Sequence, residues 1–448
     1  MAKDKLTDYD ATAANNTDVG GISVDEGMLP SNVNNAIREV MSHLKDFAAG
    51  TQGVTAIGVD TISETTADNG VVVDSVTLKD GEVGTTSSPV TINLTSINGS
   101  QIGGRRNLII NGAMTVAQRG TSSTGTAYAT VDRIYSSQDG TMTSLVTTKE
   151  QSSDSPNGFS NSFKITTDTA QTVASDDYYY ARIGVIEGQD VQHLNYGASS
   201  AKTMSLSFWV KSSETGVYAI TNYLHDDNRS YPITYTINSA NTWEYKTLTI
   251  SGDTVGVIDN DNGRGFEIYF LLSAGSNLTG GGTAEQWQAY AISHFAKGHT
   301  ADVAGTANAT WQITGIQLEV GSTATEFEHR SFAEELALCQ RYCIVYGGDS
   351  IYDRIATGHS VSTIQWNAFV TFPVEMRTGP TESTSADSDF ALYHANTVTA
   401  LTSLGVNYAS KKTVTLSGDV ASGLTTGRSV QLLTNATTDA RLTLDAEL

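Results

Sequence analysis

Apolar and polar side chains alternate along several stretches of this 448-residue chain. The clearest stretch runs from Met204 to Val210, and the same period of two returns in Phe266–Phe270 and in Trp311–Val320. In the last stretch the alternation slips by one residue at Gly315, as a β-bulge at a glycine would produce. Half-buried strands that follow one another without intervening helices predict a mainly β protein. Its largest part, residues 106–330, is predicted to be a two-sheet sandwich of the jelly-roll type.

Residues 331–346 then change to a helical pattern. Ser331 and Glu334 have the spacing of a capping box, in which each side chain accepts a hydrogen bond from the backbone N–H of the other residue. A narrow apolar stripe follows, which predicts a helical connector with a contact seam for oligomerisation. The seam residues are Leu336, Cys339 and Cys343.

The chain has only two cysteines, Cys339 and Cys343. One helical turn does not suit the geometry of a disulfide, and two thiols without a neighbouring histidine pair do not form a zinc site. We therefore expect both to behave as small buried apolar side chains rather than as a redox pair.

The last hundred residues return to the strand pattern. Alternation over residues 364–372, with shorter strands at 412–416 and 429–432, predicts a second and smaller β-domain over residues 347–448. In a slender molecule this domain would form the tip.

The first fifty residues contain one clear element, a helix that begins near Pro30 and is capped by Ser31 or Asn32. Its apolar positions recur every 3.5 residues, which favours a coiled-coil seam between identical chains. The alternative is an ordinary amphipathic helix packed on its own domain. The seam residues are Val33, Ile37, Val40, Leu44 and Phe47.

Between this helix and the sandwich, residues 51–105 are rich in Val, Thr, Ser, Asp and Gly. A short motif recurs at residues 59–63 and 73–77, with a looser copy at 92–97. Each copy has too few apolar groups to form a core in one chain, so we expect a slender β stalk in which several chains intertwine. A disordered linker is the alternative.

The formal net charge is −22. This acidic excess argues against a nucleic-acid-binding protein, which needs clustered Lys and Arg, and against adhesion to an anionic membrane. Apolar runs stay shorter than the ~18 residues that span a membrane, so no membrane insertion is expected. The polar start does not resemble a secretory signal, which favours folding in a cytoplasm.

Motifs of catalysis are missing from the sequence. There is no Gly-x-Ser-x-Gly elbow, and the histidines never have the His-x-x-x-His spacing of zinc hydrolases. Paired carboxylates, which cleave glycans in some enzymes, occur at Asp226–Asp227, Asp259–Asp261 and Glu334–Glu335. With 48 acidic residues in the chain, chance pairs are abundant. We expect a non-enzymatic protein without catalytic residues or a cofactor.

Two short segments could bind a ligand. The turn Asp259–Gly263 is rich in oxygen ligands and could hold a structural Ca²⁺ at Asp259 and Asp261, but a polar turn between strands is the favoured explanation. The run Tyr178, Tyr179 and Tyr180 could stack on sugar rings, against the alternative of ordinary strand packing. Tyr223, His225 and Trp287 have less support as glycan contacts.

Several stretches resemble a protein family. Asn107–Met114, Gln118–Gly120 and Val131–Arg133 resemble the opening of a domain found in bacteriophage tail fibres. Its close is similar to Ile313–Gly321, which Glu326–Arg330 and Glu334–Tyr342 follow here. Further stretches that resemble the family are Pro30–Glu39, at the virion-proximal end, and Phe372–Arg377, in the C-terminal domain.

The resemblance implies a homotrimeric tail fibre. The N-terminus would bind tail tube or adaptor proteins, and the carbohydrate-binding-like sandwich and the tip would recognise a host surface glycan or an outer-membrane protein. The protein would be made in the host cytoplasm and carried on the tail of the virion. Two alternatives stay open, a glycan-depolymerising tailspike and a connector or head fibre that binds no receptor.

Overall fold

The computed structural model describes residues 3–49 and 105–448, apart from residue 349, together with four two-residue strands between them. These strands form two hairpins, β3 (Gly84–Thr85) with β4 (Ser88–Pro89) and β5 (Ser96–Ile97) with β6 (Ser100–Gln101). The chain divides into two compact units, Met1–Ile92 and Asn93–Leu448. Apart from these hairpin strands and residue 105, the stalk predicted for residues 51–105 lies outside the described residues, as do its repeats at 59–63 and 73–77.

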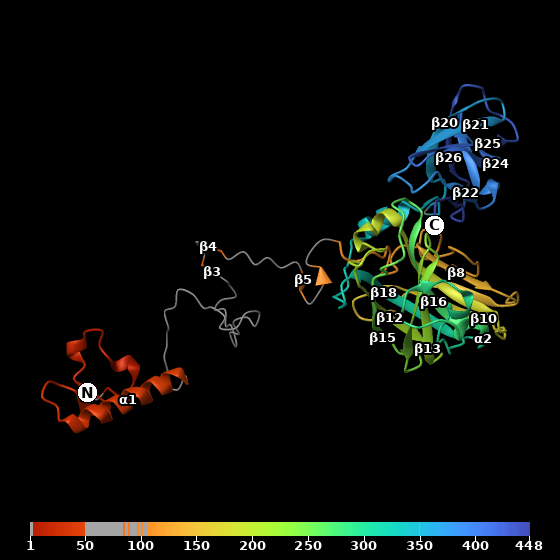
Figure 1. The fold of residues 1–448 in the computed structure, drawn as a ribbon. Coiled ribbons are helices and arrows are strands. Elements are labelled where there is room, and N and C mark those ends of the chain that lie inside the picture. Colours follow the sequence, from red (N-terminus) through yellow and green to blue (C-terminus); the bar gives the residue numbers. More distant parts are fainter. Residues whose placement is uncertain are drawn as a thin grey trace. The chain divides into compact units, whose positions relative to one another are not determined.

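The N-terminal unit is built around helix α1 (Pro30–Ala48), drawn in red in Figure 1. The helix begins at Pro30, and no side chain caps it, so the expectation of a cap at Ser31 or Asn32 is wrong. Proline suits the first helical position because a backbone N–H there would have no partner in the helix. The helix contacts η1 (Leu6–Asp8) and the hairpin of β1 (Asp18–Val19) and β2 (Ile22–Ser23).

Two faces of α1 have different surroundings. Ala36 and His43 are buried under the preceding segment, where the Tyr9 hydroxyl lies 2.7 Å from His43 Nδ1. One face of the helix therefore packs within its own unit, as the alternative of an amphipathic helix on its own domain expects. Val40 is half-buried. The other predicted seam residues are 37–54% exposed: Val33, Ile37, Leu44 and Phe47.

Residues 122–320 form the predicted sandwich, and the prediction of a mainly β protein is confirmed. Each of its two sheets has six antiparallel strands. Sheet I contains, in spatial order, β15 (Glu244–Ile250), β12 (Met204–Ser212), β18 (Thr310–Val320), β10 (Ser162–Thr169), β9 (Val146–Ser152) and β7 (Ser122–Ser123). Sheet II contains β17 (Gln288–Ala289), β14 (Arg229–Ile237), β13 (Gly216–Leu224), β16 (Arg264–Ala274), β11 (Tyr178–Glu187) and β8 (Ile134–Asp139).

The core lies between the two sheets. Phe208 of sheet I contacts Phe270 of sheet II with ring centroids 5.3 Å apart, and Phe270 lies 5.9 Å from Trp311. Trp311 Nε1 donates to the Tyr235 hydroxyl at 3.1 Å, so the buried indole N–H has a partner. The slip at Gly315 is confirmed, because the pairing of β12 with β18 is irregular between Ser207 and Trp209 and Gly315 has φ +63°.

Helix α3 (Phe332–Gln340) follows the sandwich, and its capping box is confirmed. The Glu334 N–H donates to Ser331 Oγ at 3.3 Å, and the Ser331 N–H donates to Glu334 Oε2 at 3.1 Å. A further short helix, α2 (Ser276–Thr279), lies in the loop after β16. Among the described residues, no helix is long and apolar enough to cross a lipid bilayer.

The helix ends before Cys343, which corrects the predicted connector over residues 331–346. Cys343 belongs to strand β19 (Cys343–Tyr346), because this segment pairs with a strand near the end of the chain. Cys339 and Cys343 are fully buried in the packing of their own chain, and Leu336 is half-buried. The two cysteines therefore form no exposed seam for another chain, and their expected role as small buried side chains fits the structure.

The C-terminal β-domain contains a closed barrel, drawn in blue in Figure 1, around the fully buried Trp366. The barrel strands are β20 (Arg354–Ser360), β21 (Gln365–Thr371), β25 (Thr413–Val420), β24 (Thr397–Ala409), β23 (Phe390–His394) and β26 (Ser429–Thr434). A separate three-stranded sheet consists of β19, β27 (Leu442–Asp445) and β22 (Thr381–Thr384), which come before, after and between the barrel strands in the chain. The alternation indicated strands but not that they close into a barrel.

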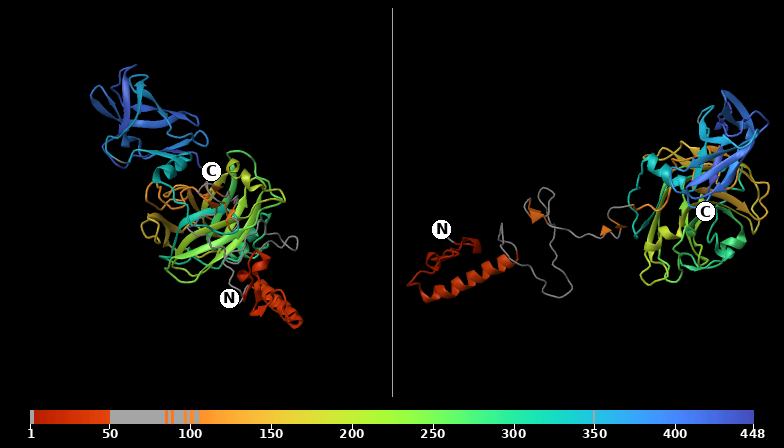
Figure 2. Two further views of the ribbon diagram at one scale, coloured as in Figure 1. Left: turned by 90° about the vertical axis from the view of Figure 1, so that its left-hand side faces the viewer. Right: turned by 90° about the horizontal axis from the view of Figure 1, so that it is seen from above.

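The last residues of the chain contact the sandwich, and the C-terminal end lies beside it in Figures 1 and 2. The Glu447 carboxylate pairs with Arg133 and lies 3.4 Å from Arg119 Nη1. The Arg133 guanidinium also stacks on the Tyr342 ring, 3.5 Å from its centroid. All three charged side chains are less than 10% exposed. Each of these buried charges is stabilised by its oppositely charged partner, because water cannot solvate it.

The first prediction concerns this buried pair. Glu447→Ala leaves Arg133 without its carboxylate partner in a buried site, so the free energy of unfolding should fall by about 3–5 kcal/mol. The matched control is Glu375→Ala, which breaks an ion pair with Lys412 whose side chains are 50% and 74% exposed. The control should leave stability unchanged within error. Urea denaturation of the full chain, followed by circular dichroism, measures both, and equal effects would contradict the assignment.

The second prediction concerns the thiols. Burial raises the pKa of Cys339 and of Cys343, so neither forms the reactive thiolate in the folded protein. A thiol reagent such as DTNB should label neither cysteine within minutes at pH 8 in buffer and both in urea. Rapid labelling of the native protein would show that the β19 region opens.

Candidate functional site

The outer face of sheet II carries a band of aromatic rings. Side chains alternate along β11, so Tyr178 and Tyr180 lie on the outer face while Tyr179 lies in the core. Tyr179 is fully buried, and its hydroxyl is 2.9 Å from Thr147 Oγ1. The predicted run of three tyrosines is thus divided: two belong to the outer face and one to packing.

Strands far apart in the sequence extend this band. Tyr180 lies 5.4 Å from Tyr269 of β16, and Tyr223 of β13 lies 5.3 Å from Tyr290, measured between ring centroids. Tyr178 and Tyr180 stack at 5.8 Å. Together these rings line a cleft of about 260 Å³. A cleft of this kind offers flat apolar faces to a small ligand.

Phe295 is a buried residue that packs against the aromatic rings of this band. It follows η6 (Ile292–His294), is 5% exposed, and contacts the rings of Tyr178 and Tyr269 at 5.4 and 5.2 Å. Burial raises the pKa of Tyr180 and of Tyr290 to about 12. Both phenols are therefore uncharged at neutral pH and can donate a hydrogen bond.

The other end of the cleft is polar. Arg264 Nη1 and His225 Nδ1 lie 3.5 and 3.9 Å from Glu267 Oε1, and both side chains are 40% or more exposed. Glu267 itself is fully buried, and the Tyr269 hydroxyl donates to its other oxygen. Glu267 Oε1 accepts no hydrogen bond from the described residues. This end can therefore donate hydrogen bonds to ligand hydroxyls or carboxylates through Arg264 and His225.

Sequence reasoning gave little weight to Tyr223 and His225 and did not select Arg264, Tyr269 or Tyr290. All five line the cleft. A signal was present for Tyr269, which stands at an outward position of β16 between the inward Ile268 and Phe270. Trp287 does not line the cleft; its Nε1 donates to the Ser251 carbonyl at 2.6 Å, and its ring contacts Tyr196.

The carboxylate pairs from the sequence are held by other contacts. Asp226 accepts from the Asp259 N–H at 2.9 Å, and Asp261 accepts from the Gly263 N–H at 2.8 Å, so the turn is stabilised by its own hydrogen bonds. Glu335 pairs with Arg330 at 3.3 Å. In the part of the chain that the structure describes, no three His, Cys, Asp or Glu side chains gather as a metal site would require. A Ca²⁺ site at Asp259 and Asp261 gains no support from this geometry.

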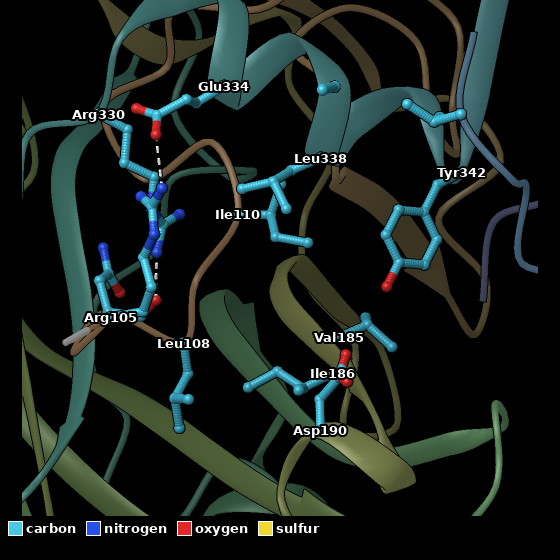
Figure 3. Close-up of a pocket in the computed structure, with 13 residues that line it drawn as sticks. Arg105, Leu108, Ile110, Val185, Ile186, Asp190, Arg330, Glu334, Leu338 and Tyr342 are labelled. Carbon is cyan, nitrogen blue, oxygen red and sulfur yellow. Dashed lines mark hydrogen bonds and ion pairs between the residues drawn. The ribbon is translucent and has the colours of Figure 1, made fainter.

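A larger cavity of about 560 Å³ lies between α3 and the end of β11 (Figure 3). Leu338 of α3 lies next to Ile110, and Val185 and Ile186 lie across from them. Its arginines are already paired, Arg105 with Glu334 at 2.5 Å and Arg330 with Glu335 at 3.3 Å. This cavity is mainly apolar, so it offers less to a polar ligand than the aromatic cleft does.

Comparison with protein-family models and with curated proteins finds no match. Among solved structures, the chain is similar to the enzymatically active domain of tailspike protein 4 of bacteriophage CBA120, with 14% identity and a TM-score of 0.26 over 48% of this chain and 21% of that one. It is also similar to a family 11 carbohydrate-binding module of a Clostridium thermocellum cellulase (13% identity, TM-score 0.23, 46% of this chain and 98% of that one). A chain described as a "putative sugar binding protein" from Bacteroides thetaiotaomicron shows 11% identity and a TM-score of 0.27 over 48% of this chain and 100% of that one. Scores this low leave the function to be argued from the site itself.

Proposed function

We propose that this protein is a phage tail fibre that attaches to its host, and that the aromatic cleft of sheet II binds a host surface glycan without cleaving it. One observation carries the proposal: the rings of Tyr178, Tyr180, Tyr223, Tyr269 and Tyr290 converge on one cleft from strands and loops that are distant in sequence. Packing alone does not require so many half-exposed aromatic side chains on the outer face of a sheet.

Carbohydrate fits both ends of the cleft. The C–H faces of a pyranose ring are apolar and stack on tyrosine rings, whereas its hydroxyls need donors and acceptors at the edge. Arg264 and His225 supply donors at the polar end. A single small cleft gives weak binding, and several copies on one fibre would raise the avidity through effective concentration.

The fibre assignment rests on the resemblance of residues 107–133 and 313–342 to tail fibres and on the exposed stripe of α1. A stripe of Val33, Ile37, Leu44 and Phe47 that is left uncovered within one chain favours burial against identical chains. We infer a homotrimer whose N-terminal unit binds tail tube or adaptor proteins.

The third prediction tests the cleft. Tyr180→Ala should weaken binding by about fivefold or more, because each stacked ring contributes on the order of 1 kcal/mol or more. The ligand is the bacterial surface oligosaccharide that the full chain selects on a glycan array. Biolayer interferometry measures the affinity. The matched control, Tyr408→Ala, removes a 78% exposed tyrosine of β24 and should not change binding. A loss in both variants, or in neither, would contradict the assignment.

A reducing-end assay separates binding from cleavage. Incubation of the protein with the purified polysaccharide should generate no new reducing ends over hours. If reducing ends accumulate, the glycan-depolymerising alternative replaces the adhesin.

The fourth prediction tests the helix. Ile37→Asp combined with Leu44→Asp puts two charges on the exposed stripe, so the oligomer should dissociate to monomer. The control, Asn35→Asp with Ser42→Asp, places the same charges on the opposite face of α1 and should leave the mass unchanged. Light scattering coupled to size exclusion gives the mass. A wild-type protein with the mass of a monomer would contradict the proposal of an oligomer.

A further inference from the structure

The outer face of sheet I carries a second aromatic cleft, of about 670 Å³, which shares no residue with the first. One wall is formed by Trp209 of β12 and Tyr245 of β15, which are direct partners in the strand register. Their ring centroids are 5.2 Å apart, and Tyr245 is 45% exposed. The half-exposed tryptophan and the exposed tyrosine, whose ring planes are tilted by 44°, offer an apolar surface on this sheet face.

The second wall comes from two loops. Phe159 follows β9, and Phe327 and His329 follow β18. The three rings lie 4.9–5.3 Å from one another. The cleft is therefore lined by two groups of aromatic rings, which suits a ligand with apolar faces.

Gly315 fixes the position of the second wall. Its φ of +63° belongs to the bulge, and a Cβ at this position would lie 2.6 Å from Phe159 Cζ. Only glycine allows both the bulge and the close approach of the Phe159 ring to the sheet. The wall is thus built by the backbone of the sandwich and does not depend on loop packing alone.

Polar groups in this cleft have unused hydrogen-bonding capacity. The side chains of Asn157, Glu326 and His329 line it and form no hydrogen bond or ion pair with any residue in the described part of the chain. An amide, a carboxylate and an imidazole can donate to and accept from ligand hydroxyls. An apolar peptide would desolvate these groups without pairing them, which costs free energy.

The charge of this cleft differs from that of the first. Glu326 is the carboxylate of the lining, and the described residues that line the cleft include no Lys or Arg. The first cleft instead has Arg264 at its polar end. Acidic sugars are therefore disfavoured here, whereas an amino group on a sugar would be attracted to Glu326.

We propose that the cleft on sheet I is a second carbohydrate-binding site, specific for neutral or amino pyranoses, that acts independently of the cleft on sheet II. A pyranose ring would lie between the Trp209–Tyr245 wall and the Phe159 wall, with its hydroxyls or amino group at Asn157, Glu326 and His329. One chain then binds two different sugars on opposite faces of one sandwich.

The test uses the full chain on an array of defined oligosaccharides in three classes, neutral, amino-sugar-containing and uronic-acid-containing. Trp209→Ala should lower binding to neutral or amino oligosaccharides at least tenfold and leave every oligosaccharide that depends on Tyr180 unaffected. The matched control is Trp243→Ala, because Trp243 lies outside this cleft, near Lys211 and Asp154. This control should change neither the binding of neutral or amino oligosaccharides nor the binding of oligosaccharides that depend on Tyr180. Glu326→Gln, at an exposed position, should selectively weaken binding of amino sugars.

Each outcome decides between the two sites. If Tyr180→Ala and Trp209→Ala abolish the same oligosaccharides, there is one site and the second proposal is wrong. If Trp209→Ala keeps its unfolding midpoint and loses no oligosaccharide, the second site alone fails. If it lowers the oligomer mass instead, this face contacts another copy of the chain, which also overturns the proposal. Absence of any binding by the wild-type protein would overturn both sites together.

Discussion

The buried contact between Arg133 and Glu447 links the sandwich to the end of the chain, and much of the structure depends on it. A buried arginine is tolerable only when a carboxylate lies beside it, so the C-terminal residues must stay in place once Arg133 is enclosed. The link continues towards the first cleft. Arg182 donates to the Leu448 carbonyl at 2.8 Å and lies 3.6 Å from Glu267, the carboxylate beneath the polar end of that cleft. The charges that join the two parts of the chain therefore also set the electrostatics of the candidate binding site.

Two stretches singled out in the sequence, the opening stretch Asn107–Met114 and the closing stretch Glu334–Tyr342, form hydrogen bonds near this junction. Asn111 of the opening stretch is buried. Its N–H donates to Glu335 at 2.6 Å, and its side-chain amide donates to two backbone carbonyls. Arg341 of the closing stretch donates to Glu187 at 2.6 Å and 2.7 Å. Asn111, Glu335 and Glu187 are buried, so loss of the hydrogen-bonding partner of any of them would leave a buried polar group unpaired. These hydrogen bonds stabilise the packing of the sandwich against the segments that follow it, whereas the two aromatic clefts lie on its outer faces.

Local patterns predicted local structure well. Alternation places Phe208 inwards and Trp209 outwards whatever the rest of the chain does, and the slip at Gly315 needs only the glycine itself. The spacing of Cys343 from Cys339 predicts a helix. Cys343 instead lies in a strand, because its segment pairs with β27, about a hundred residues later in the chain. Among the residues that line the first cleft, the sequence singles out Tyr178 and Tyr180 and gives less support to Tyr223 and His225. Tyr290 lies in a loop, and no periodicity says where a loop will place a ring.

Hydroxyl-radical footprinting of the full chain, with and without the oligosaccharide that it binds on an array, tests the central claim most directly. The side chains at the two clefts are accessible in the free protein, so a sugar that covers them must slow their oxidation. The account predicts protection at Tyr178, Tyr180 or Tyr223 for ligands of sheet II, and at Trp209 or Tyr245 for ligands of sheet I. Protection confined to the barrel, for example at Tyr408, with both clefts oxidised as before, would contradict it.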